Sequence, residues 1–183
     1  DEFLTPESAA ICARECAAGR APVTMANAER AILARLRAMR EEDFAPFDGG
    51  GEGLYHRFYD AVQRETTIDG ILAAAKSKRY AYARLRRLLL AAYLGVTPED
   101  IPQRVPYLRV LACNARGREV LKTMKTTAAA PVLTRSADVR RLDADAQRLF
   151  ALTARAEEQY VLAYPSLAAA RPGSAWTTDP VIL

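Results

Sequence analysis

Apolar residues at helical spacing, bracketed by residues that start and stop helices, recur along the first half of this chain. Thr5-Pro6-Glu7 has the pattern of an N-cap, a first-turn proline and an acid favoured by the helix dipole, and Gly19 follows as a stop. Asn27 and Thr67 are further candidate caps, and Gly95 closes a leucine-rich run. The helices expected in this way cover residues 6–18, 27–40, a stretch carrying Leu54 to Val62, 68–76 and 80–94.

The second half adds short strands. Residues 106–113, "PYLRVLAC", are rich in β-forming side chains, and "PVLT" at 131–134 is a second candidate strand. Between them a helix is expected after Asn114, with Val120, Leu121 and Met124 facing inward. The fold class predicted is therefore mainly α, a helical domain with a small two-stranded parallel β-α-β element inserted.

A last helix is expected over residues 137–163, followed by an extended tail in which Trp176 and residues 181–183 pack on the body. We expect an N-terminal helical segment over residues 1–66 and a basic helical domain with short strands over residues 67–183. The alternative is that the two form one continuous domain. The triplet Gly49-Gly50-Gly51 lacks a following Gly-Lys-Ser/Thr, so we interpret it as a connector and not a phosphate loop.

Length and composition indicate a folded, non-membrane chain. Half of the 183 residues are apolar, yet no eighteen apolar residues run without a charge, so no membrane-spanning helix is expected. Three cysteines do not make a disulfide framework, and a cytoplasmic location fits them. Because the chain begins with Asp1 and not Met, we expect a fragment of something longer or a processed product.

Charge is segregated along the sequence. Residues 76–125 hold twelve basic residues against three acidic ones, a net +9, which leaves −5 for the rest of a chain whose total is +4. Six of these cations lie within "KSKRYAYARLRR", residues 76–87, where two tyrosines are interleaved. Such a distribution favours a polyanionic partner.

The sequence offers little for catalysis. The single histidine, His56, has no Ser or Cys beside it in a catalytic pattern, and no Walker, Rossmann or zinc-hydrolase motif is present. Cys12 and Cys16 would share a helix face, but with few other soft ligands we interpret them as ordinary thiols and predict no metal site. No catalytic residue is assigned, and the chain alone is not expected to form a complete active site.

The case for nucleic acid is stronger, because Lys and Arg neutralise phosphates and tyrosine rings stack on unpaired bases. The alternative for residues 76–87 is a solvated basic turn whose arginine stems pack on the domain. The candidate RNA-binding residues are Lys76, Lys78, Arg79, Tyr80, Arg84, Arg87, Arg116, Arg118 and Lys122. For Tyr80 two roles remain open, stacking on a base or packing under the turn.

The order of "TIDGILAAAKSKRYAYARLRRLLLAAYLG", "PYLRVLACNARGREVLKTMK" and "PVLT" resembles the C-terminal region of the bacterial tRNA(Met) cytidine acetate ligase family. The most specific piece is Lys-x-Lys-Arg-Tyr-x-x-x-Arg, matched from Lys76 to Arg84. Upstream, "FLTPESAAICARECAAGRAP" and "AERAILARLRAM" are similar to the segment after the family's catalytic domain.

This resemblance implies an enzyme that activates acetate with ATP and acetylates N4 of the wobble cytidine of elongator tRNA(Met). It also implies a nucleotidyltransferase-like N-terminal catalytic domain, carrying a His-x-Gly-His type motif, that is missing here. The chain itself would then bind tRNA and no cofactor, while ATP and acetate would belong to the full-length enzyme. The alternative is a non-catalytic module that docks on a protein partner or on the missing domain.

Overall fold

The structure, a computed structural model, describes residues 3–49 and 53–183, so Gly50 and Gly51 of the glycine triplet lie outside the described residues. It divides into two compact units. The first unit comprises the chain up to Pro98 together with Gln159–Arg171, and the second comprises Glu99–Glu158 with Pro172–Leu183. The predicted boundary between residues 66 and 67 falls inside the first unit, where the helices on either side of it pack together.

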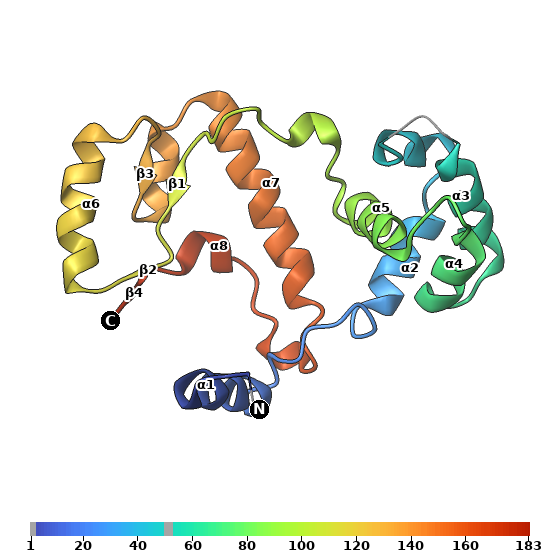
Figure 1. Cartoon of the computed structure of the whole chain (residues 1–183), viewed down its shortest axis with the longest axis horizontal. Helices are drawn as coiled ribbons and strands as arrows, with labels where there is room; N and C mark the ends of the chain where they lie inside the picture. Colours follow the sequence, from blue (N-terminus) through green and yellow to red (C-terminus); the bar gives the residue numbers. More distant parts are fainter. Residues whose placement is uncertain (1–2, 50–52) are drawn as a thin grey trace. The chain divides into compact units, whose positions relative to one another are not determined.

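Helices dominate both units, as predicted, and the strands are short (Figure 1). The α-helices are α1 (Pro6–Ala17), α2 (Glu29–Arg37), α3 (Leu54–Arg64), α4 (Ile68–Ala75), α5 (Tyr82–Leu94), α6 (Ala115–Thr127), α7 (Ala144–Val161) and α8 (Ser174–Thr177). The 3-10 helices are η1 (Glu42–Phe47), η2 (Pro98–Asp100), η3 (Ser136–Arg141) and η4 (Leu167–Ala169). None of the helices within the described ranges has the length and apolarity that crossing a membrane requires.

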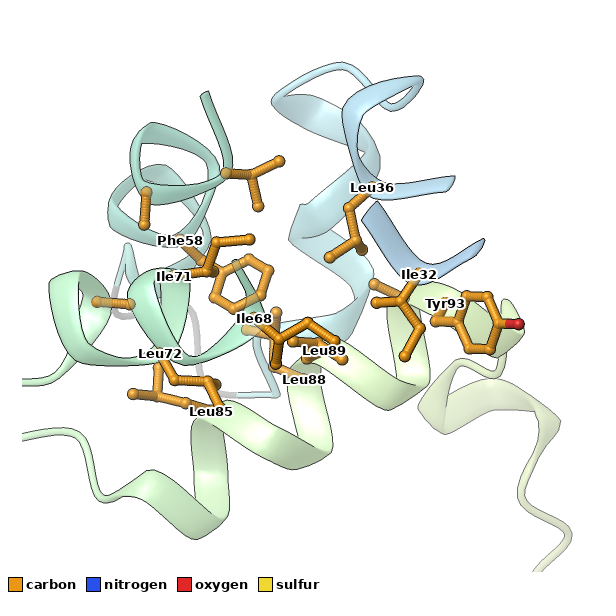
Figure 2. Close-up of a cluster of buried hydrophobic side chains, with 14 of the residues drawn as sticks. Ile32, Leu36, Phe58, Ile68, Ile71, Leu72, Leu85, Leu88, Leu89 and Tyr93 are labelled. Carbon is orange, nitrogen blue, oxygen red and sulfur yellow. The ribbon is translucent and has the colours of Figure 1, made fainter. Parts of the chain in front are cut away.

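The core of the first unit lies between α2, α3, α4 and α5, with Phe44 of η1 beside Phe58 at 5.7 Å between ring centroids. Burying a large apolar side chain of this kind contributes about 1.5–3 kcal/mol. The apolar faces predicted from helical spacing are the faces that these helices bury in the core. Figure 2 shows Ile32, Leu36, Phe58, Ile68, Ile71, Leu72, Leu85, Leu88, Leu89 and Tyr93 gathered in this core.

Three of the predicted helix ends are confirmed by their hydrogen bonds or backbone geometry. The hydroxyls of Thr5 and Thr67 accept from the backbone N–H three residues on, and Gly95 ends α5 with a φ of 68°. The prediction for Asn27 is wrong. Its amide instead donates to the carbonyls of Pro22 (3.0 Å) and Ala163 (2.9 Å), tying together distant parts of the first unit, and α2 begins two residues later.

The second unit contains the predicted parallel β-α-β element. Strand β1 (Leu108–Arg109) pairs in parallel with β3 (Val132–Leu133), and α6 connects them. The predicted strand over 106–113 changes partner midway, because β2 (Ala112–Cys113) pairs in parallel with β4 (Val181–Ile182). A second apolar core surrounds Phe150 of α7, with Trp176 of α8 edge-on at 4.7 Å.

Three expectations for the second unit need correction. The helix predicted over 137–163 is broken into η3 and α7, because Asp143 accepts from the N–H of Ala146 (2.8 Å) and starts a new helix. The tail is not wholly extended, since it includes α8, and residues 181–183 are exposed despite the strand. Val120 is 54% exposed, because α6 has no buried residue against so small a sheet.

Candidate nucleic-acid interface

The basic segment, Lys76–Arg87, begins where α4 ends and runs into α5. Arg57 of α3 fixes its start: the guanidinium donates to the carbonyls of Ala74 and Ala75 (2.9 Å each) and of Lys76 (3.2 Å). These carbonyls have no partner within the helix, so a single side chain satisfies the end of α4. The entry of the basic segment is thus attached to the body of the first unit.

Tyr80 anchors the middle of the segment. Its N–H donates to the hydroxyl of Ser77 (3.2 Å), and this hydrogen bond closes a tight turn. Tyr80 is only 7% exposed and belongs to the apolar core of the first unit. The guanidinium carbons of Arg79 and Arg84 lie 6.0 and 5.3 Å from the centre of its ring. Of the two roles left open for Tyr80, its position matches packing under the turn.

Arg84 is held by an acid. Its guanidinium donates to a carboxylate oxygen of Asp48 (3.3 Å) and to the Asp48 carbonyl (3.2 Å). The other carboxylate oxygen accepts from the N–H of Leu54 (3.0 Å), the first residue of α3. The Arg84 side chain remains 29% exposed.

The outer face of the segment is cationic and carries an exposed ring. Among the described residues, Lys78, Arg86 and Arg87 are exposed and form no ion pair. Tyr82 is 44% exposed, with the Lys76 ammonium 5.8 Å and the Arg86 guanidinium carbon 6.0 Å from its ring centre. Tyr82 is therefore the better stacking candidate, although it is not among the RNA-binding residues predicted from the sequence.

The candidates on α6 do not form one line. The helix begins after Asn114, as predicted, and Asn114 caps it by accepting from the N–H of Gly117 (2.8 Å). Arg118 and Lys122 share a side, whereas Arg116 lies roughly 160° away from Arg118 at 100° per residue. Lys122 donates to Glu119 at 2.8 Å, but both side chains are exposed, so this pair leaves the lysine available.

Other titratable groups lie apart from these cations in the sequence. His56 is exposed and contacts Glu41, and Cys12 and Cys16 are exposed free thiols on α1. Hydrogen bonds from Arg20 (2.6 Å) and Arg14 lower the pKa of Glu15 to about 2. Within the described ranges, no group of three or more His, Cys, Asp or Glu side chains could hold a metal ion.

The sequence matches the model of a known protein family. The model of the family described as HIGH Nucleotidyl Transferase matches residues 1–173. The chain belongs to this family. The one histidine of the chain lies in Tyr55-His56-Arg57-Phe58, so the His-x-Gly-His type motif expected of the catalytic domain does not occur in this sequence.

Several curated proteins that are similar to this chain carry one specific name. A tRNA(Met) cytidine acetate ligase of Kosmotoga olearia is 37% identical over 131 residues, which cover 69% of this chain and 31% of that protein. The protein of the same name in Syntrophomonas wolfei is 28% identical over 187 residues, covering 97% of this chain and 45% of the relative. The chain thus spans less than half the length of these curated relatives.

Solved structures agree with the family assignment. Thermotoga maritima TmcAL, in its apo form I and in form II bound with alpha-thio ATP, is 26% identical to the chain. The TM-scores are 0.91 and 0.92, over 98% of this chain and 46% and 47% of the solved chains. Coverage of this extent does not say which part of the relatives is matched, so the assignment to their C-terminal region stays a prediction.

Proposed function

We propose that this chain is the tRNA-binding region of an ATP-dependent acetate ligase that forms N4-acetylcytidine at the wobble position of elongator tRNA(Met). The names of the relatives support the choice of substrate. The catalytic residues, ATP and acetate would belong to a domain outside these residues, and the whole enzyme would act in the cytoplasm.

One observation carries the proposal: the basic segment presents exposed cations around the exposed ring of Tyr82, on a backbone that Arg57 and Tyr80 fix to the core. A fixed row of cations binds phosphates without first ordering a loop, which would cost conformational entropy. The exposed tyrosine adds a surface on which an unpaired base can stack.

The side chains of this interface would have distinct roles. Lys76, Lys78, Arg79 and Arg87 contact phosphates, and Arg84 contributes through the exposed part of its side chain. Tyr80 supports the turn from below. A second contact area on α6 comprises Arg116, Arg118 and Lys122, with Arg116 reaching a different part of the RNA from the other two.

The test is binding of the chain to elongator tRNA(Met), with initiator tRNA as the comparison, across a salt titration. The double variant Lys78→Ala/Arg79→Ala should bind more weakly, with a salt slope lower by roughly one for each phosphate that is no longer neutralised. Arg30→Ala removes an exposed arginine of α2 and serves as the matched control. A salt slope that is the same in the double variant and in the wild type would refute the assignment.

A specific observation favours the alternative, a module that docks on a protein partner or on the catalytic domain. Helix α1 has no buried residue, and Phe3 and Ile11 are 97% and 50% exposed. A chain that acts by docking would bind no tRNA at physiological salt and would associate with the separately purified catalytic domain. Binding of tRNA by the chain alone separates the two functions.

A further inference from the structure

A groove of about 500 Å³ opens in the second unit along one side of α6. Its volume lies within the range of roughly 300–1,000 Å³ that small-ligand sites occupy. Four cationic residues line it: Arg118, Lys122 and Lys125 of α6, and Arg135 at the start of η3. Lys125 and Arg135 are not among the RNA-binding residues predicted from the sequence. We call this site the cationic groove.

The charge of the cationic groove is poorly compensated. Among the described residues, Arg118, Lys125 and Arg135 form no ion pair, and the pair between Lys122 and Glu119 is exposed. Asp179 is the one acid among the residues that line the groove in the described part of the chain. Cations gathered around a hollow raise the local concentration of anions, so the groove favours an anionic occupant.

The remaining lining is largely apolar. Val110, Leu121 and Ile182 contribute to it, and the thiol residue Cys113 lies among them. An occupant must therefore combine negative charge with a planar or apolar part. A nucleotide has this chemistry, because its base presents apolar faces and its phosphate is charged.

The spacing of the cations indicates a strand. Arg118, Lys122 and Lys125 share one side of α6 and extend over about 10 Å along its axis, at 1.5 Å per residue. A row of this length suits successive phosphates along a chain better than one compact phosphate group.

We propose that the cationic groove holds an unpaired nucleotide of a single-stranded RNA segment, its base against the apolar lining and its flanking phosphates on the α6 cations. The inference rests on the proposed function in one respect: the strand would be an unpaired part of the same tRNA. It adds a site in the second unit to the basic segment of the first, with Lys125 and Arg135 as contacts.

The thiol of Cys113 reports occupancy directly. In a Cys12→Ser/Cys16→Ser background Cys113 is the one cysteine left, and both replaced residues are exposed on α1. A saturating single-stranded RNA oligonucleotide should slow alkylation of Cys113 by about tenfold, whereas a duplex RNA should protect it far less. An unchanged alkylation rate at saturating RNA overturns the proposal. Equal protection by duplex RNA overturns the claim that the bound nucleotide is unpaired.

Adenosine monophosphate separates a strand from a free nucleotide. We expect it to protect Cys113 weakly, because it supplies one phosphate to a row of cations. If the mononucleotide protects Cys113 at concentrations as low as those of the oligonucleotide, the groove is a free-nucleotide site. That result overturns the claim that it binds an RNA strand.

Charge reversal tests the contacts. Lys125→Glu and Arg135→Glu should each weaken binding of the oligonucleotide by about tenfold. Arg140→Glu is the matched control, since Arg140 is an exposed cation of η3 that does not line the groove. Equal losses in all three variants would indicate a general charge effect and count against the site.

The two proposals fail separately. If Lys78→Ala/Arg79→Ala weakens tRNA binding and lowers its salt slope while the oligonucleotide still protects Cys113, both proposals stand. If tRNA binds through the basic segment but Cys113 reacts at its full rate, the groove alone is overturned. If no tRNA binds yet Cys113 is protected by the oligonucleotide, the proposed function fails and the groove remains an RNA site.

Discussion

The guanidinium of Arg84 lies 3.3 Å from a carboxylate oxygen of Asp48, a residue that is only 4% exposed. Because Asp48 also accepts from the first N–H of α3, it joins the segment before α3 to α5. Replacing Asp48 by alanine leaves the buried N–H of Leu54 without its acceptor and removes the carboxylate that binds Arg84. Asp48→Ala should therefore lower the free energy of unfolding by about 2–4 kcal/mol in urea titrations.

A matched acid on the surface gives the comparison. Asp60→Ala removes an exposed partner, 3.8 Å from Arg64, and should change the free energy of unfolding by less than about 0.5 kcal/mol. A double-mutant cycle between positions 48 and 84 then isolates their coupling. Additive effects would show that the pair does not form in solution.

Arg57 should control the order of the basic segment. Arg57→Ala leaves three carbonyls at the end of α4 without their side-chain donor and should cost about 1–2 kcal/mol of unfolding free energy. Arg57→Lys should not rescue it, because an ammonium lacks the planar fork that reaches three carbonyls. Hydrogen exchange of the amides of residues 76–80 should become faster in both variants. Exchange as slow as in the wild type would place the restraint elsewhere.

Two tyrosines of the basic segment should differ in what their loss affects. Tyr80→Ala empties part of the core and should cost about 3 kcal/mol of unfolding free energy, while Tyr80→Phe keeps the packing. Tyr82→Ala should leave stability within about 0.5 kcal/mol and weaken tRNA binding by about tenfold, the loss of one stacked base. Calorimetry and tRNA titration on the same samples check both, and reversed effects would exchange the two roles.

Glu15 should titrate at unusually low pH. The hydrogen bonds from Arg20 and Arg14 hold its pKa near 2, below the ordinary 4.5. A depressed pKa in the folded state contributes stability above pH 4.5, and this contribution is lost as the pH falls from there towards 2. An NMR titration of the Glu15 carboxyl should show the low midpoint, and Arg20→Ala should raise it. A wild-type midpoint near 4.5 would mean that the pair with Arg20 is not populated.

Local sequence patterns predicted the helix ends well where a side chain interacts only with its own helix. Thr67 and Gly95 act at the helix ends as their chemistry requires, and Leu85, Leu88 and Leu89 of α5 pack inward. Asn27 failed as a predicted cap because its amide binds the carbonyl of Ala163, a partner 136 residues away that no local pattern reveals. The pairing of β2 with β4 is of the same non-local kind.

The candidate site was predictable in composition but not in the orientation of its members. Tyr80 and Tyr82 look alike in sequence, and the turn closed by Ser77 decides which one is buried. The Arg84 partner, Asp48, lies 36 residues earlier and gave no signal of its own. Asp143, in contrast, offered a readable cap that would have divided the last helix correctly.

The division into units assigns residues 159–171 to the first and residues 172–183 to the second, so the polypeptide passes between them three times. Neither unit is one uninterrupted stretch of sequence. No single proteolytic cut in a connection can release one from the other, and neither can complete its fold on the ribosome until its late segment has been synthesised. Independent domains fold in order of synthesis, but here residues 159–183 are needed to finish both.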